Sequence, residues 1–285
     1  MNLLIAAVFF SIMQGHGITM TVTPASLHPG SPFLLHVGGL TAKTTYDVRF
    51  DDRMLTFRGS GEVDLLLGVD LSHPVGGDDV LLYRHNSALP LTYVALSVKS
   101  HVYPDQHLTL PRGLVELTPP ELKRALREQK ALDVIFADDR TRRMWEGGFI
   151  MPVEGAVSSP FGGKRFLNGE PRSPHTGIDI EGKPGEPVVA SNDGVVRFEG
   201  SLFFGGNSII IDHGQGVYSM YFHLQRYAVK KLEYVQKGQI IGYIGDTGRV
   251  TGPSIHFGIR IVDSRIDPEL LFALENKNNL KKGGR

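Results

Sequence analysis

The sequence predicts a mainly β protein, with a compact antiparallel β domain preceded by a small β-sandwich and a helical connector. Short apolar runs separated by glycine- and proline-rich turns occupy residues 19–99 and again residues 149–266, a pattern typical of β domains. Residues 118–145 instead show a helical periodicity. A chain of 285 residues also suggests two domains. We therefore divide it into an N-terminal segment (1–17), a β-sandwich (18–100), a connector (101–148), a second β domain (149–273) and a polar, basic tail (274–285).

Charge and cysteine content exclude several classes of function. The chain has 30 Lys and Arg against 30 Asp and Glu, so its formal net charge of zero gives no electrostatic reason to expect a nucleic-acid partner. It has no cysteine, which excludes a disulfide scaffold and cysteine-based catalysis. Any metal site must therefore use histidine and carboxylate ligands.

The N-terminal segment carries an almost unbroken apolar run from Leu3 to Met13. This run is too short to span a membrane and is typical of the core of a signal peptide. No charged residue leads it and the cleavage site is not a clean small-x-small match, so a retained apolar anchor and a first buried strand remain alternatives. We expect an exported protein of the periplasm, cell envelope or extracellular space, with no transmembrane span once the signal is removed.

The predicted β-sandwich consists of short strands separated by turn signals. The candidates are Thr19 to Val22, Phe33 to Val37, Tyr46 to Phe50, Val63 to Val69, Val80 to Tyr83 and Leu91 to Val98. Their residues contain no catalytic constellation. A positioning or binding module and a merely covering domain are both compatible with this pattern.

The connector contains a helix-start signal. Thr118 is suited to the N-cap, Pro119 to the first helical position, and Glu121 completes a capping box. The periodicity predicts a helix that runs on to Trp145, ends before Gly147, and packs between the two domains.

From Phe149 onward the sequence predicts strands and no helix before Asp267. The candidates are Val188 to Val189, Gly194 to Phe198, Asn207 to Asp212, Tyr218 to His223 and Gln239 to Ile244. His213 lies between two of these strands among turn residues, so we interpret it as structural. Tyr218, Met220 and Phe222 alternate, which places His223 on the opposite face of its strand together with Tyr221.

His175 and Asp179 are four residues apart, a spacing that puts both side chains on one face of a helix or a strand. Pro174 and Gly177 argue against a helix, and the isoleucines on either side of Asp179 alternate at the strand period. We therefore expect those isoleucines to point into the core, and His175 and Asp179 to point toward one site.

A second segment, residues 254–261, alternates in the same way. The apolar face consists of Ile255, Phe257, Ile259 and Ile261, and the polar face of Ser254, His256, Gly258 and Arg260. If the two segments meet, His175, Asp179 and His256 form a three-ligand set suited to a catalytic zinc ion, which keeps a fourth coordination position open for water.

The chain from roughly Phe149 to Leu271 resembles the lysostaphin-type (LytM-type) zinc metalloendopeptidases. The motifs that carry the resemblance are Ser159-Pro160-Phe161-Gly162, Pro174-His175-Thr176-Gly177-Ile178-Asp179, Ile211-Asp212-His213-Gly214, Tyr221-Phe222-His223-Leu224, Gly245-Asp246-Thr247-Gly248-Arg249-Val250-Thr251-Gly252-Pro253 and Ile255-His256-Phe257. Their order, spacing and glycine pattern all match. The resemblance implies a compact antiparallel β core, a zinc ion in an open groove, and cleavage of peptide bonds in bacterial cell walls.

Position by position, His175, Asp179 and His256 match the zinc ligands of that family. His223 matches a catalytic histidine that orients or deprotonates the zinc-bound water. The family's last motif is His-x-His, and its first histidine is a second catalytic group, but this chain has Ser254 there. A serine hydroxyl cannot act as an acid or base near neutral pH. We therefore expect zinc binding to persist and hydrolysis to be weakened.

Two functions follow from this resemblance. The first is a zinc-dependent endopeptidase that hydrolyses the peptide stems or cross-bridges of peptidoglycan, impaired through Ser254. The second is a non-catalytic, zinc-containing cell-wall-binding or regulatory protein on the same fold. Intact metal ligands favour the first and Ser254 favours the second. A substitution that traps an inactive form, and a protein activator that opens the groove, are further alternatives that the sequence leaves open.

Overall fold

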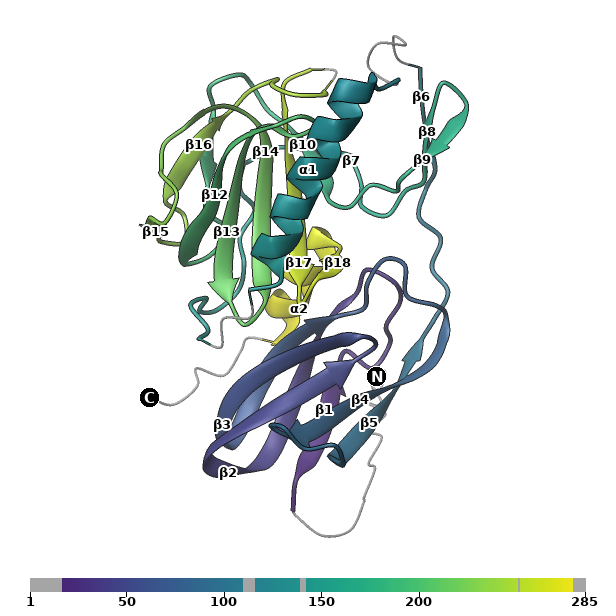
Figure 1. Cartoon of the computed structure of the whole chain (residues 1–285), viewed down its shortest axis with the longest axis vertical. Helices are drawn as coiled ribbons and strands as arrows, with labels where there is room; N and C mark the ends of the chain where they lie inside the picture. Colours follow the sequence, from purple (N-terminus) through teal and green to yellow (C-terminus); the bar gives the residue numbers. More distant parts are fainter. Residues whose placement is uncertain (1–16, 110–115, 139–141, 251, 279–285) are drawn as a thin grey trace, which may run out of the picture.

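The computed structural model describes residues 17–109, 116–138, 142–250 and 252–278, which form two β domains joined by a connector (Figure 1). The predicted mainly β class is confirmed. The predicted signal segment lies outside the described residues except for Gly17. Among the described helices, none combines the length and the apolar character needed to cross a membrane.

The N-terminal domain is a five-stranded sheet in the order β1-β2-β4-β5, with β3 also paired to β2. Its strands are β1 (Thr19–Thr23), β2 (Pro32–Phe50), β3 (Arg53–Gly68), β4 (Gly76–Arg84) and β5 (Pro90–Val98). Two of the predicted short strands are merged in β2, because the chain passes Gly38 and Gly39 with a shift of register instead of a turn. Leu27 forms a bridge with Val98, so the sheet curls round its own core.

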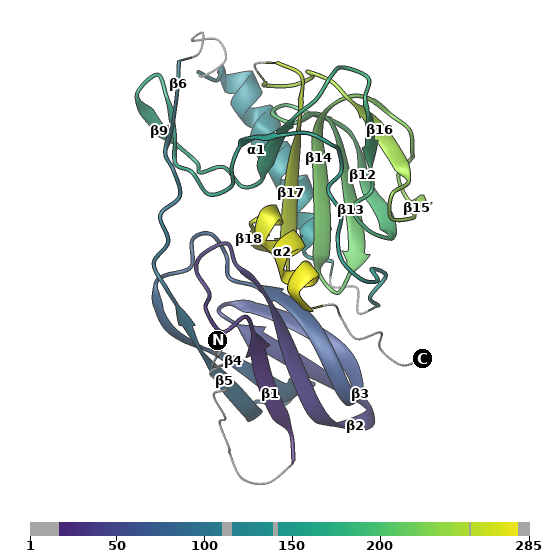
Figure 2. The ribbon, with the colours of Figure 1, turned by 180° about the vertical axis from the view of Figure 1, so that it is seen from behind.

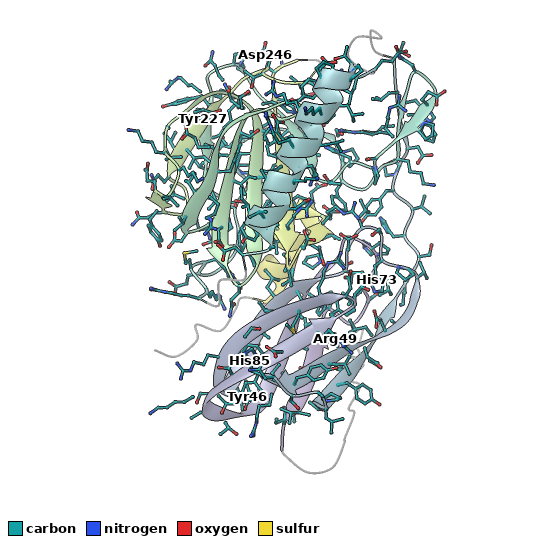
Figure 3. All side chains as sticks on the ribbon, viewed as in Figure 1. Tyr46, Arg49, His73, His85, Tyr227 and Asp246 are labelled. Atoms are coloured by element: carbon teal, nitrogen blue, oxygen red, sulfur yellow. The ribbon has the colours of Figure 1, made fainter. Side chains whose placement is uncertain are left out.

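Histidines of the N-terminal domain have partners within that domain. Figure 3 shows His85 farther from the C-terminal domain than His73. The His85 Nδ1 atom lies 3.0 Å from Asp47 Oδ1. The His73 Nε2 atom lies 2.9 Å from Asp78 Oδ2, and Nδ1 lies 2.8 Å from the Pro74 carbonyl oxygen. We therefore interpret the His73 and His85 rings as structural.

The connector begins with a short strand and ends with a helix. Strand β6 (Gln106–Leu108) pairs parallel with β8 (Arg165–Leu167), and β8 pairs with β9 (Glu170–Arg172). This small sheet stands beside the C-terminal domain, on the side away from β15 and β16 (Figures 1 and 2).

Helix α1 (Pro119–Phe136) begins as predicted, because the Glu121 carboxylate accepts the Thr118 backbone N–H at 2.7 Å. The prediction that it continues to Trp145 is wrong. Phe136 is buried against Ile210 on one face of β13 (Gly206–Gly214), whereas Trp145 joins the core on the other face. The helix also covers the outer face of the C-terminal sheet and does not pack between the domains (Figure 1).

The C-terminal domain is a ten-stranded sheet in the order β15-β12-β13-β14-β17-β10-β7, with β16 on β14, β11 on β16 and β18 on β17. The remaining strands are β7 (Val157–Ser159), β10 (Ile178–Glu181), β11 (Pro187–Val189), β12 (Gly194–Leu202), β14 (Val217–Tyr227), β15 (Tyr234–Val235), β16 (Ile240–Ile244), β17 (Ser254–Ile261) and β18 (Ser264–Ile266). As predicted, no helix is described between Phe149 and Asp267. Helix α2 (Pro268–Asn278) lies at the domain junction (Figure 2).

The two domains are joined by a buried ion pair. The Asp70 carboxylate accepts hydrogen bonds from Arg265 Nη2, Nε and backbone N at 2.5, 3.0 and 2.8 Å. Burial alone would raise the pKa of Asp70, but the hydrogen bonds from Arg265 and Ser72 hold it well below its usual range. Leu34 and Leu66 of the N-terminal sheet are part of the C-terminal core. The domains are therefore packed against each other through both polar and apolar contacts.

Candidate metal centre and catalytic cleft

The pairing of β10 with β17 brings the two predicted segments together. The strands are antiparallel, with Asp179 opposite His256 and Ile178 opposite Phe257. Ile178 and Phe257 are fully buried, which fixes the register because a one-residue slip would turn every apolar side chain outward. Asp179 and His256 consequently lie side by side on the open face of the sheet.

His175 reaches the same point from the loop that precedes β10. The backbone of this loop is held by hydrogen bonds from Gly162 N to His175 O (2.8 Å) and from His175 N to Gly163 O (3.0 Å). The His175 Nε2 atom lies 3.0 Å from Asp179 Oδ1 and 2.9 Å from His256 Nδ1, and Asp179 Oδ1 lies 2.7 Å from His256 Nδ1. The three side chains therefore converge as expected, but His175 reaches the site from the loop and not from the strand that its spacing indicated.

The hydrogen bonds of His175 determine which ring nitrogen is free to bind a metal. Its Nδ1 lies 2.9 Å from the Pro160 carbonyl oxygen, which can only accept, so Nδ1 carries the proton. Nε2 then presents a lone pair toward Asp179. A ring N–H held by a backbone carbonyl is the usual arrangement of a metal-binding histidine.

Two neutral imidazoles and one carboxylate suit a zinc ion. Burial lowers the pKa of His256, which favours the neutral ring. Burial alone would raise the pKa of Asp179, but the His175 and His256 rings beside it hold that pKa well below its usual range, so the carboxyl group is ionised. The three donor atoms lie within 4.8 Å of one another. Their spacing, the negative charge of Asp179 and the imidazole lone pairs fit a divalent cation.

Gly177 permits the close approach of the two segments. A Cβ atom at this position would lie 2.4 Å from the Phe257 carbonyl oxygen and 2.8 Å from His256 Nε2. The sequence pattern identified Gly177 as a helix breaker. The structure adds that any side chain here would displace the Phe257 backbone or the His256 ring.

Arg165 and Ser159 surround the ligands. Arg165 Nη2 donates to Asp179 Oδ2 at 3.1 Å, and Ser159 Oγ lies 3.0 Å from His175 Nδ1. Sequence reasoning missed both roles. Ser159 does lie in a motif of the resemblance, which could have pointed to it, but Arg165 lies in none.

His223 lies in the same cleft, although its predicted strand face is wrong. The sequence placed it opposite Phe222, yet both residues line the cleft, and the Phe222 ring stacks on the His256 ring at 5.4 Å. The alternation breaks because His223 has a φ of 67°, in the left-handed region. Its backbone N–H donates to the Gly205 carbonyl at 2.7 Å, which supports this strained conformation.

The ring of His223 has one nitrogen, Nε2, that can accept a proton. Its Nδ1 lies 2.8 Å from the Thr247 carbonyl oxygen and therefore carries the hydrogen, which leaves a lone pair on Nε2. Burial lowers the pKa of His223, so the neutral form predominates near neutral pH. Its ring centroid is 6.4 Å from that of His256.

Ser254 lies at the edge of this arrangement. It is the first residue of β17 and is half-buried, and its hydroxyl donates to the Gly252 carbonyl at 3.5 Å. It shares a strand face with His256, as predicted, but is not among the described residues that line the cleft.

The cleft has a volume of about 390 Å³ and lies directly over the three ligands. Its walls combine apolar and basic side chains. Besides His175, Asp179, His223 and His256, the lining includes Leu167, Phe204, Phe222, Val250, Arg165 and Arg249. A volume of this size and a mixed apolar and polar lining are typical of a ligand-binding cleft.

His213 is a structural histidine, as the sequence indicates. It is fully buried, with Nδ1 2.7 Å from the Asp193 carbonyl oxygen and Nε2 2.7 Å from Ser219 Oγ. Burial lowers its pKa to about 4.

This burial predicts an acid-sensitive fold. Below about pH 6.5 the unfolded chain binds a proton at His213 that the folded protein does not bind until about pH 4, so the free energy of unfolding falls across this window. The expected loss is about 3 kcal/mol. Chemical unfolding of the parent and of His213→Gln between pH 4 and 7.5 measures it. The free energy of unfolding of His213→Gln should change less with pH than that of the parent. Equal pH dependence in the two proteins would show that His213 is not the source of the acid sensitivity.

Comparison with known proteins agrees with this geometry. Residues 173–268 match the model of Peptidase family M23. The C-terminal domain is therefore similar to the M23 peptidases, and we call it the M23 domain. The chain is 40% identical over 125 residues to the DD-carboxypeptidase/endopeptidase Mpg of Neisseria meningitidis, and 42% identical over 125 residues to the peptidoglycan DD-endopeptidase ShyC of Vibrio cholerae. Each alignment covers 43% of this chain and 29% of the relative, so the likeness spans less than a third of those proteins.

The likeness to one solved structure extends beyond the M23 domain. A crystal structure of a Pseudomonas aeruginosa protein assigned to peptidase M23 superposes with a TM-score of 0.64 at 25% identity, over 86% of this chain and 94% of that one. Because this coverage exceeds the M23 domain alone, the shared architecture includes much of the N-terminal β domain and the connector.

Proposed function

We propose that this protein is a zinc-dependent endopeptidase that hydrolyses peptide bonds in the stems or cross-bridges of peptidoglycan, with a rate reduced by Ser254. The observation that carries the proposal is the convergence of His175, Asp179 and His256 in an open cleft that His223 also lines. The family match supports a peptidase, and the names of Mpg and ShyC support a peptidoglycan substrate.

When bound by these residues, zinc would polarise the scissile carbonyl and lower the pKa of water. His223 would take the proton of the attacking water at Nε2, with its ring held by the Thr247 carbonyl. Arg165 would keep Asp179 oriented through its bond to Oδ2. Phe204 and Phe222 would hold the apolar parts of a peptide in the cleft.

Ser254 stands where the family has its second catalytic histidine, which would stabilise the developing oxyanion or pass a proton to the leaving amine. A serine hydroxyl can donate a hydrogen bond but cannot act as an acid or base near neutral pH. The serine therefore also supports the second candidate, a non-catalytic zinc-containing protein that binds the cell wall or regulates another hydrolase. Both candidates use the same cleft and ligands.

We further propose that the protein is exported to the periplasm or cell envelope. The apolar run from Leu3 to Met13 supports export. So does the lipoprotein NlpD/LppB homolog of Pseudomonas aeruginosa, which is 35% identical over 123 residues.

Incubation of the purified protein with isolated cell walls tests the enzymatic proposal. We expect slow release of soluble muropeptides, loss of release after chelation, and recovery when zinc is added back. His223→Ala should remove the release while leaving zinc content unchanged. Zinc-dependent retention on the walls without any release, even after prolonged incubation, would favour the binding protein instead.

A further inference from the structure

Gln106 bonds to neighbours of the proposed zinc ligands although it lies on the connector strand β6, outside the matched M23 residues. Its Nε2 donates to Ser159 Oγ at 2.6 Å, and its Oε1 accepts from Arg165 Nε at 3.0 Å. Each of these partners in turn contacts a proposed zinc ligand: Ser159 is next to His175 Nδ1 at 3.0 Å, and Arg165 bonds to Asp179 Oδ2 at 3.1 Å. One amide thus links the partners of two ligands.

The partners determine the orientation of this amide. Arg165 can only donate, so the amide oxygen of Gln106 must face it and the NH₂ group must face Ser159. The Arg165 guanidinium is therefore held at Nε by Gln106, which aims Nη2 at Asp179. The Ser159 oxygen is held beside the ring N–H of His175, the proton that leaves Nε2 free for a metal.

The backbone of the connector holds Gln106 in place. Gln106 lies opposite Arg165 in the β6–β8 pairing, and its backbone N–H donates to the Lys164 carbonyl at 2.8 Å. Just before it, the Tyr103 hydroxyl donates to the Pro29 carbonyl of the N-terminal domain at 2.8 Å, and the Tyr103 ring packs against Phe161 of the M23 domain at 5.6 Å. The segment from Tyr103 to Gln106 is thereby fixed to both domains.

We infer that Gln106 is a positioning residue of the metal centre, which orients Asp179 through Arg165 and His175 through Ser159. The connector strand then completes the site that the M23 domain contains, and zinc affinity depends on the two hydrogen bonds of the Gln106 amide. This inference rests on the proposed binding of zinc by His175, Asp179 and His256. Residues that orient metal ligands typically contribute tenfold to a hundredfold in metal affinity.

Gln106→Met tests the role of the amide, because methionine keeps the length of the side chain and removes both hydrogen bonds. We expect zinc affinity, measured by competition with a chromogenic chelator, to fall by about tenfold to a hundredfold. Gln106→Glu should retain more affinity than Gln106→Met, since a carboxylate still accepts from Arg165 Nε and from the Ser159 hydroxyl. Thermal unfolding of the metal-free proteins reports whether each variant is folded, and Gln106→Ala replaces Gln106→Met if that variant is not.

His107→Ala is the matched control. This neighbour on β6 stacks on Phe166 with ring centroids 4.6 Å apart, so its loss weakens strand docking and leaves the hydrogen bonds of Gln106 intact. We expect zinc affinity close to that of the parent. Unchanged affinity in Gln106→Met, or equal losses in Gln106→Met and His107→Ala, would overturn the inference while leaving the proposed function in place. A parent protein that binds no zinc would overturn both.

Discussion

Asp179→Ala should lower zinc affinity by more than about a hundredfold, because removing a direct ligand costs more than removing a residue that only orients one. Asp179 is the one carboxylate among the three converging side chains, and its Oδ1 lies within 3.0 Å of both imidazole nitrogens. The substitution removes both a ligand and the negative charge that offsets the cation. It also leaves the Arg165 guanidinium, a cation, beside the metal position.

Elemental analysis after dialysis, followed by chelator competition, measures this effect. Asp246→Ala is a suitable control, because Asp246 is exposed and lies at the end of the M23 domain remote from the N-terminal domain (Figure 3). It should bind about one zinc per chain, like the parent. Full zinc content in Asp179→Ala would show that residues other than Asp179 hold the ion.

Ser254→His should raise peptidase activity by about a hundredfold or more, with zinc content unchanged. Ser254 shares a strand face with His256 and lies two residues away, roughly 6 to 7 Å along the strand. The serine hydroxyl is short and bonds to the Gly252 carbonyl, outside the cleft lining. An imidazole at this position extends further and titrates near neutral pH, so it can protonate the leaving amine.

The rise in peptidase activity expected for Ser254→His should depend on His223. Combining Ser254→His with His223→Ala should remove the added activity, because the two histidines would act on one water and one scissile peptide. Release of peptides from cell walls and from short cross-bridge peptides measures both variants. A Ser254→His protein that binds zinc but digests neither substrate would show that the missing histidine is not the limiting defect, and would favour a purely binding role.

The sequence by itself determined the features that depend on local periodicity. Strand alternation predicts that Asp179 and His256 each lie on the polar face of a strand whose other face is apolar, and the structure agrees. A local capping signal predicts the start of α1 at Thr118. In each case the energetic reason lies within a few residues, in the burial of alternate side chains or in the capping of free N–H groups.

Only the tertiary structure decided the features that depend on distant contacts. His223 joins Phe222 in the cleft because a bond to Gly205 supports a left-handed φ that no alternation pattern shows. Helix α1 stops at Phe136 because Phe136 and Trp145 are buried on opposite faces of β13. Gln106 and Arg165 reach the ligands through the pairing of β6 with β8, which joins segments about sixty residues apart. Local sequence does not specify such pairings, because their free energy comes from hydrogen bonds and packing that exist only once the two domains and the connector have docked.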